Sequence, residues 1–348
     1  MGGTVTRESG RPRPTLESVA SAAGVSKATV SKVLNGREDV GSDTRAQVAK
    51  VLERLEYVPR ARRSAGARRV FEVLFDGFRS PYTLEIIRGI TEAAGELDVD
   101  VVVGPALGSA PDAEWVRRIV AAAREGVLIV TSNLTDDHWQ RLADAKVPVV
   151  VVDPVGVPSV DVPSVGAMNW AGGLAATEHL IKLGHRRIGV LGGRPDTLCA
   201  RARVHGYHAA MDAAGIPADP ALVRYGDFGY DVAYEHGLEL LALQPRPTAV
   251  FATSDLQAFG LIEAARVRHV RVPDHLSVVG FDDLPTARWA APPLTTVRQP
   301  LADMGRLALR YAERLATGGA LDTNRVELAT ELVIRESTAA PGTGTDLP

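Results

Sequence analysis

The apolar and polar positions along the chain follow two patterns that meet near residue 69. Residues 15–57 repeat their apolar positions with a helical period and carry no strand signal. After residue 70, short apolar runs alternate with longer amphipathic stretches. Strict alternation of strand and helix is typical of a parallel sheet covered by helices on both faces. The pattern therefore predicts an all-α head followed by an α/β body.

Seven apolar runs are the predicted strands of the body. Several of them lack polar alternation, as expected when both faces of a sheet are buried. The runs are residues 70–75, 99–103, 126–130, 147–152, 188–191, 249–252 and 276–280. The predicted helices between them include residues 83–97, 113–123, 171–183, 203–214, 230–243 and 255–266. This stretch is long for a single sheet, so we expect two similar lobes.

Three short helices are predicted in the head. The first covers residues 16–23, with Thr15 as its N-cap. Gly24 follows at once and suits a tight turn between two helices, where a positive φ is often needed. The second helix covers residues 27–34, and the third runs from about residue 42 to residue 56. This order predicts a helix-turn-helix.

The exposed face of the second helix combines small and basic residues, which suits a helix that enters a major groove. Ala28 can touch a thymine methyl group, and Lys27 and Lys32 can reach guanine edges or phosphates. The predicted DNA contacts are Thr15, Ser26, Lys27, Ala28, Thr29, Ser31, Lys32, Asn35, Thr44, Arg60 and Arg63. The alternative is a generic three-helix bundle with a solvated polar face.

The charge distribution supports a nucleic-acid partner for the head alone. Residues 1–69 hold 14 basic and 7 acidic groups, a formal charge of +7, so the remainder carries −10 of the chain's total of −3. A basic head on an acidic body indicates DNA contact confined to the head. A solvated basic arm would give the same signal, so charge by itself does not decide.

The remaining composition concerns the compartment and the ends of the chain. One cysteine, Cys199, excludes an intramolecular disulfide and fits a reducing compartment. We find no signal peptide and no apolar run of membrane-spanning length, so we expect a soluble cytoplasmic, nucleoid-associated protein. The expected divisions are a disordered arm at 1–13, a DNA-binding domain at 14–59, a basic linker at 60–69, an effector domain at 70–337 and a disordered tail at 338–348.

Motifs in both parts resemble one known family, the LacI/GalR family of bacterial repressors. In the head they are residues 15–20 (TLESVA), 23–26 (AGVS), 29–36 (TVSKVLNG) and 55–59 (LEYVP). In the body they include residues 184–189 (GHRRIG), 203–207 (RVHGY), 278–283 (VVGFDD) and 293–300 (PLTTVRQP). The resemblance covers roughly residues 14–337.

The resemblance implies a three-helix DNA-binding head and a two-lobed body of the periplasmic-binding-protein type. It places the three crossings between lobes near residues 164–169, 296–299 and 322–325. It further implies a homodimer that reads a pseudo-palindromic operator, one half-site per head. A small-molecule effector in the cleft between the lobes would control operator affinity. The first candidate is a mono- or oligosaccharide, and the alternative is a purine-like or other metabolite.

One position departs from the family pattern. Family members usually carry a leucine seven residues past the proline that matches Pro59, and that leucine wedges into the minor groove. Here the position is Gly66, which supplies no wedge and weakens a helix by about 1 kcal/mol relative to alanine. The basic residues of 60–69 could follow phosphates instead, or form a flexible linker.

The predicted effector site lies at the strand ends, because parallel sheets bind ligands beyond the carboxyl ends of their strands. By resemblance, Arg203 and Asp282 hold vicinal hydroxyls of the ligand. The full predicted set is Tyr82, Thr83, Asp153, Trp170, Arg203, Phe228, Ser254 and Asp282. Trp170 and Phe228 could stack on a sugar or serve ordinary packing. For Asp255 the sequence leaves two roles open, capping of the following helix and contact with the ligand.

Two other classes of protein compete with a regulator. A periplasmic transport component would need a signal sequence and would have no use for the head. An enzyme would need a catalytic motif, and neither a P-loop, a dinucleotide fingerprint nor a nucleophile elbow stands where it would have to be. We therefore expect a regulator rather than an enzyme, without catalytic residues, metal or cofactor.

Overall fold

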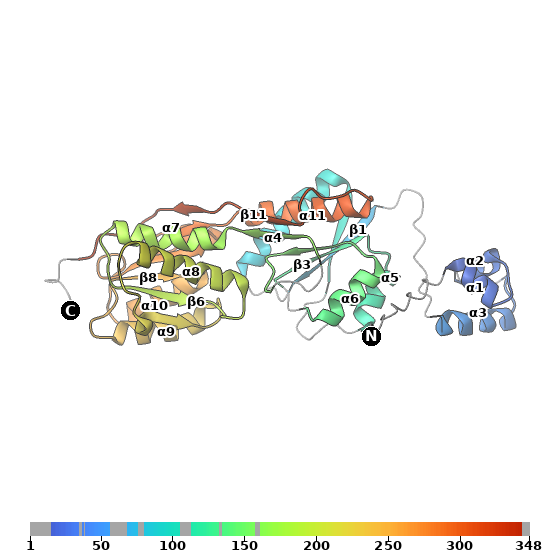
Figure 1. Cartoon of the computed structure of the whole chain (residues 1–348), viewed down its shortest axis with the longest axis horizontal. Coiled ribbons are helices and arrows are strands. Elements are labelled where there is room, and N and C mark those ends of the chain that lie inside the picture. Colours follow the sequence, from blue (N-terminus) through green and yellow to red (C-terminus); the bar gives the residue numbers. More distant parts are fainter. Residues whose placement is uncertain are drawn as a thin grey trace, which may run out of the picture. The chain divides into compact units, whose positions relative to one another are not determined.

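The computed structural model describes residues 15–34, 37, 39–55, 68–75, 80–104, 113–131, 134–156 and 161–342. They fall into a smaller N-terminal unit, which holds the helical head, and a larger unit, which holds two sheets; each is described by itself (Figure 1). No helix within these ranges is long and apolar enough to cross a membrane.

The head consists of α1 (Leu16–Ala22), α2 (Lys27–Leu34) and α3 (Ser42–Arg54). Their apolar faces meet in a small core that includes Val19, Val30 and Val48, all fully buried. Thr15 caps α1 in a reciprocal pair of hydrogen bonds with Ser18. Gly24 has a φ of +62°, so the turn between α1 and α2 takes the left-handed conformation that the sequence indicated. The three-helix prediction is confirmed.

The first lobe of the body is a six-stranded sheet in the order β11-β5-β4-β3-β1-β2, and all of its pairings are parallel. Its strands are β1 (Arg69–Phe75), β2 (Val99–Val103), β3 (Gly126–Val130), β4 (Val149–Val152), β5 (Ser164–Ala167) and β11 (Arg325–Leu328). Three helices connect consecutive strands of this sheet, namely α4 (Pro81–Leu97), α5 (Ala113–Ala121) and α6 (Asp136–Ala145). A fourth, α11 (Leu301–Ala316), directly precedes β11.

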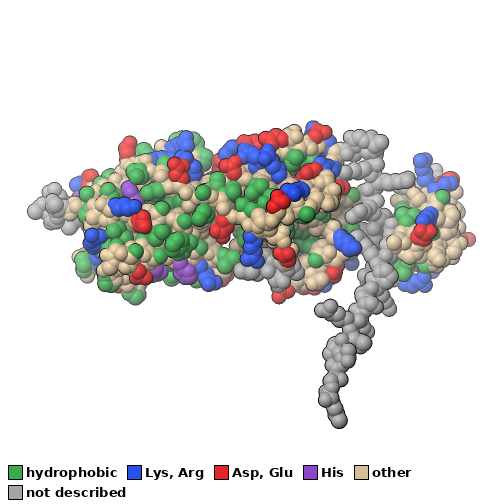
Figure 2. Space-filling model, turned by 45° about the horizontal axis from the view of Figure 1, so that its top comes forward, with side chains coloured by type: hydrophobic (Ala, Val, Ile, Leu, Met, Phe, Trp, Pro, Cys, Tyr) green, Lys and Arg blue, Asp and Glu red, His purple; other side chains and the backbone are tan. Residues whose placement is uncertain are grey.

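Helices α4 and α11 pack closely against each other and bury the main core of this lobe against β1, β3 and β4. Gly89 allows the approach, because a Cβ at this position would overlap the backbone carbonyl of Ala302 on α11. Charged side chains of both signs gather over the outer surface of this helix pair (Figure 2). Among them, Arg310 pairs with Glu96 at 2.7 Å across the two helices.

The second lobe is a six-stranded sheet in the order β12-β10-β9-β8-β6-β7, with β12 antiparallel to β10. Its strands are β6 (Ile188–Gly192), β7 (Val223–Tyr225), β8 (Ala249–Ala252), β9 (Ser277–Asp282), β10 (Thr295–Arg298) and β12 (Glu331–Val333). Helices α7 (Asn169–Lys182) and α8 (Leu198–Ala213) bury one face, while α9 (Tyr230–Ala242) and α10 (Asp255–Val267) bury the other. Short 3-10 turns occupy Pro220–Leu222 and Pro285–Arg288. Two helix-covered sheets confirm the predicted fold class.

The chain passes between the two lobes three times. The first passage lies between β5 and α7, the second between β10 and α11, and the third between β11 and β12. The sequence prediction for the third passage, residues 322–325, is wrong: those residues precede β11 or begin it, and the passage follows that strand. The family resemblance placed this passage a few residues too early, and β11 and β12, as short edge strands, give too weak a strand signal to correct it.

The C-terminal segment corrects a second prediction. Residues 338–342 belong to the predicted disordered tail, yet Thr338 and Ala339 are hydrogen-bonded to the second lobe. The buried ring of His185 lies within 2.9 Å of the Ala339 carbonyl and 3.0 Å of Ser277 Oγ. A polar composition suggested disorder, but complementary polar groups of the lobe hold these residues.

Candidate functional site

A cavity of about 320 Å³ lies in the body at the carboxyl ends of the parallel strands. Both lobes line it: α4 and the end of β4 on one side, and α8 and the ends of β8 and β9 on the other. Seven of the eight predicted effector-site residues line this cavity, namely Tyr82, Thr83, Asp153, Arg203, Phe228, Ser254 and Asp282. The strand-end rule therefore predicted residues that lie together around one cavity.

Arg203 is the central cation of the cavity, and its side chain is almost fully buried. Its Nε donates to Asn169 Oδ1 at 2.8 Å and its Nη1 donates to the Thr253 carbonyl at 2.6 Å. The guanidinium also stacks over the Phe281 ring, 3.9 Å from the ring centroid. These contacts fix the planar fork in one orientation, so it is ready for a ligand oxygen without further ordering.

Asp282 ends β9 and is the main carboxylate beside Arg203, with 3.7 Å between Oδ1 and Nη1. Gln299 donates to the same oxygen at 2.7 Å. Burial raises the pKa of Asp282 to about 6, against the lowering influence of Arg203 and Gln299. The carboxylate is therefore poorly solvated and keeps acceptor capacity for a donor from a ligand.

Asp255 does not serve either of the roles that the sequence left open. Ser254 caps α10, because its Oγ accepts from the Gln257 amide at 3.1 Å. The Asp255 carboxylate is fully buried and accepts from the Leu284 amide at 2.8 Å and from Thr296 Oγ1 at 2.5 Å. Burial raises the pKa of this carboxyl well above its usual range. Asp255 thus ties the end of α10 to β10 and to the loop after β9.

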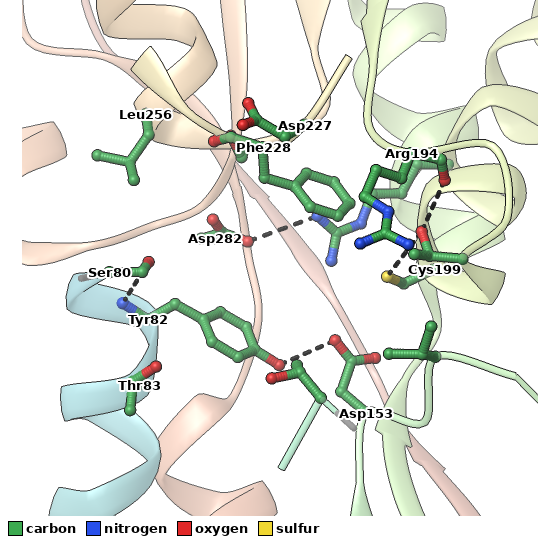
Figure 3. A pocket seen from close by; sticks show the side chains of 15 residues that line it. Ser80, Tyr82, Thr83, Asp153, Arg194, Cys199, Asp227, Phe228, Leu256 and Asp282 are labelled. Carbon is green, nitrogen blue, oxygen red and sulfur yellow. Dashed lines mark hydrogen bonds and ion pairs between the residues drawn. The ribbon is translucent and has the colours of Figure 1, made fainter. Parts of the chain in front are cut away.

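Tyr82 and Asp153 form the lower wall of the cavity, on the side of the first lobe (Figure 3). The Tyr82 hydroxyl donates to Asp153 Oδ2 at 2.9 Å. Burial raises the pKa of Asp153, while Arg203 and the tyrosine hydrogen bond oppose the shift. Asp153 also adopts a left-handed backbone with φ of +50°, as does Thr131 at +47°. Such conformations cost of order 1–3 kcal/mol and concentrate at functional sites.

Trp170 is the predicted effector residue that the structure does not bring to the cavity. Its side chain is 48% exposed, and it is not among the residues that line the cavity. The preceding residue, Asn169, begins α7 and turns inward to Arg203. Adjacent helical residues differ by about 100° in direction, which sends the next side chain outward.

Several lining residues escaped the sequence reasoning. Arg194 and Asp227 reach the cavity from loops after β6 and β7, and Figure 3 shows them on the same side as Phe228. Because both follow a strand end, the rule that found Asp153 could have found them too. Cys199 also lines the cavity, and burial raises the pKa of its thiol to about 12. The thiol is therefore protonated and unreactive at neutral pH, as expected for a cysteine buried in apolar surroundings.

The predicted DNA contacts of the head gather on α2 and beside it. Lys27, Ala28 and Lys32 are exposed, and Ser26 Oγ caps the helix by accepting from the Thr29 amide at 3.1 Å. Thr15 and Thr44 stand at the starts of α1 and α3, and Ser31 is half-buried within α2. Asn35, Arg60 and Arg63 lie outside the described residues, as does Gly66.

Two acidic side chains already pair with the lysines of α2. Lys32 Nζ lies 2.7 Å from Asp39 Oδ2, and Lys27 is paired with Glu17 of α1. All four side chains remain at least half exposed. Lys32 lowers the pKa of Asp39, which therefore stays ionised at neutral pH.

Comparison with known proteins gives one answer for both parts of the chain. Residues 15–60 match the family model described as bacterial regulatory proteins, lacI family, and residues 177–338 match a periplasmic binding protein-like domain. The HTH-type transcriptional regulator CelR of Thermobifida fusca is 37% identical over 336 residues, covering 94% of this chain and 99% of the relative.

Solved structures agree over almost the whole length. A transcriptional regulator CelR–cellobiose complex has 36% sequence identity and a TM-score of 0.70, covering 93% of this chain and 100% of the other. The lac repressor dimer bound to operator and an anti-inducer has 28% identity and a TM-score of 0.69, covering 94% and 100%. With a helix-turn-helix and a two-lobed body matched in order, the chain belongs to the LacI family of DNA-binding transcriptional regulators.

Proposed function

We propose that this protein is a cytoplasmic repressor whose affinity for its operator is controlled by a sugar bound in the body cavity. The observation that carries the proposal is the buried Arg203–Asp282 pair, fixed by packing and open to one cavity shared by two lobes. A ligand that binds one lobe arrangement better than another shifts the equilibrium between them. We propose no chemical step in this cavity.

The lining chemistry favours a polyol. Arg203 supplies forked donors and Asp282 supplies acceptors, a combination that suits adjacent hydroxyl groups. Phe228 lies with Arg203 behind it, 5.4 Å from the ring centroid, and offers an apolar surface for the face of a sugar ring. The related CelR was solved with cellobiose, so a β-linked disaccharide is the first candidate effector for this chain.

Acidity should weaken effector binding. Hydroxyl groups need the ionised Asp282 as acceptor, and its pKa of about 6 means that protonation removes this acceptor below pH 6. Affinity for cellobiose, or for the best sugar in a thermal-shift screen, should fall about tenfold from pH 8 to pH 5. Titration calorimetry across this range measures the effect.

Unfolding would not mimic that loss. A carboxyl whose pKa is raised by folding stabilises the native state below its unfolded pKa, and this stabilisation is lost as pH rises through about 6. Through this group, the body is therefore more stable at pH 5 than at pH 8. Asp282→Asn should bind weakly with a flat pH profile; a wild-type affinity that stays constant to pH 5 would contradict the acceptor role.

We further propose that α2 lies in the major groove, with Lys27, Ala28 and Lys32 toward the bases. Lys32→Ala should then weaken binding to DNA from upstream of the protein's own gene by about 1–3 kcal/mol. A gel shift at fixed salt, with the body monitored by its melting temperature, measures this change. Lys50→Ala removes the same charge from the exposed surface of α3 and should have a much smaller effect. Equal effects of the two substitutions would remove the special role of α2.

We propose that the working unit is a homodimer. Strand β2 is an edge of the first sheet, and its Val102 and Val103 are 38% and 43% exposed. Trp289 is 78% exposed in the second lobe. Apolar edge strands and large exposed aromatic groups favour a protein partner. The lac repressor relative was solved as a dimer on operator, so a second copy of this chain is the proposed partner.

A further inference from the structure

The recognition helix α2 carries two charged residues, and each is occupied by a carboxylate of the same head. Lys27 pairs with Glu17, and Lys32 pairs with Asp39 at 2.7 Å. The four groups carry no net formal charge, although the head as a whole is basic. Duplex DNA of any sequence is bound mainly through neutralisation of phosphates by Lys and Arg. The surface proposed to meet DNA is thus neutral where attraction would be strongest.

Local structure places both carboxylates beside α2. Glu17 stands in the first turn of α1, whose start is fixed by the capping box between Thr15 and Ser18. Asp39 lies in the connection between α2 and α3, which Arg45 braces by donating to the Arg37 carbonyl at 2.8 Å. Glu17 and Asp39 therefore come from two different segments that flank α2.

The pairs are weak enough to exchange. Their side chains are between 51% and 74% exposed, and exposed ion pairs are typically worth about 0.2–1 kcal/mol. A phosphate can therefore take either lysine. The released carboxylate then stands close to the DNA backbone, where like charges repel.

We propose that Glu17 and Asp39 act as brakes on DNA binding, lowering affinity for duplexes of any sequence by competing with phosphate for Lys27 and Lys32. This inference rests on the proposed placement of α2 against DNA. Contacts to base edges depend on the DNA sequence, whereas contacts to phosphates do not. Base contacts can therefore restore the lost affinity only at the operator. The carboxylates would thereby shorten the time that the protein spends on non-operator DNA. They would increase specificity by weakening the binding of wrong sequences.

The test uses the full-length protein with Glu17→Gln, Asp39→Asn and the double variant. The probe is a labelled duplex of shuffled sequence, titrated by fluorescence anisotropy at several KCl concentrations. Each single variant should bind this duplex about two- to fivefold more tightly than wild type at low salt. The slope of log K against log [KCl] should steepen by about one for each carboxylate removed.

Glu53→Gln is the matched control, because it makes the same charge change on an exposed residue of α3. It should leave affinity for the shuffled duplex near the wild-type value. Unchanged affinity in Glu17→Gln and Asp39→Asn, or an equal gain in Glu53→Gln, would overturn the proposal. A damaged head would lose affinity, so misfolding cannot imitate the expected gain.

A Lys27→Ala, Lys32→Ala variant separates this inference from the function on which it rests. If the lysine variant binds weakly and the carboxylate variants match wild type, the brake is refuted and α2 remains the DNA-contacting helix. If the lysine and carboxylate variants all match wild type, the placement of α2 on DNA is refuted, and the brake with it.

Discussion

Arg203→Ala should abolish the response to effector and lower sugar affinity at least about a hundredfold. The substitution removes the fork donors and leaves Asp282 buried without its cation, and breaking a buried pair in this way costs about 3–5 kcal/mol. The contacts to Asn169 and to the Thr253 carbonyl are lost as well. Calorimetry with the sugar identified by thermal shift, together with operator gel shifts with and without that sugar, measures both effects.

Two companion variants separate loss of recognition from loss of folding. Arg201→Ala removes an exposed arginine from the same helix, α8, and should keep the response. Arg203→Lys keeps the charge but not the planar fork, so it should hold the lobe together while binding sugar poorly. Operator binding should persist in all three variants. A full effector response in Arg203→Ala would remove Arg203 from the site.

Gly89→Ala should destabilise the body strongly, because α4 and α11 meet with no room for a methyl group. The added Cβ would overlap the Ala302 carbonyl, and a helix backbone cannot rotate away as a side chain can. We expect a loss of about 3 kcal/mol, at the upper end of overpacking effects. In a body of this size, the melting temperature should fall by about 6 °C.

The same helix offers the control. Gly95 is exposed on α4, and a Cβ there would meet no atom within 4 Å. Gly95→Ala should raise stability by about 0.5–1 kcal/mol, since alanine loses less entropy in a helix than glycine. Calorimetric or circular-dichroism melts of the two variants test the pair. Equal melting temperatures would show that α11 can move away from α4 at little cost.

The central strands were predictable because they lie in a fully apolar environment. The runs at 126–130 and 249–252 coincide with the central strands β3 and β8, and the run at 99–103 coincides with β2, a valine-rich edge strand. Strands β5, β7, β10, β11 and β12 were not predicted, because short or edge strands mix polar and apolar residues and give little periodicity. Helix α11 was not predicted either, although its sequence is strongly amphipathic.

The site was predictable as far as the strand-end rule and the family motif reach. Asp153, Ser254 and Asp282 follow or end their strands, and their side chains meet in one cavity. Trp170 lies outside the cavity because the neighbouring position on a helix, Asn169, is the one that faces inward. Asn169 and Gln299 were missed since their role is to hold Arg203 and Asp282, a relation visible only once distant segments meet.

The C-terminal segment sets where this chain can be fused to another protein. His185 finds the Ala339 carbonyl only if the chain continues past Ser337 along its native path. A reporter joined directly after residue 337 would remove the Ala339 carbonyl from His185 Nε2, which keeps Ser277 Oγ as a neighbour, and the lost hydrogen bond costs about 0.5–1.5 kcal/mol. Joined after residue 342, the same reporter would start beyond the last described residue and preserve the contact between His185 and the Ala339 carbonyl.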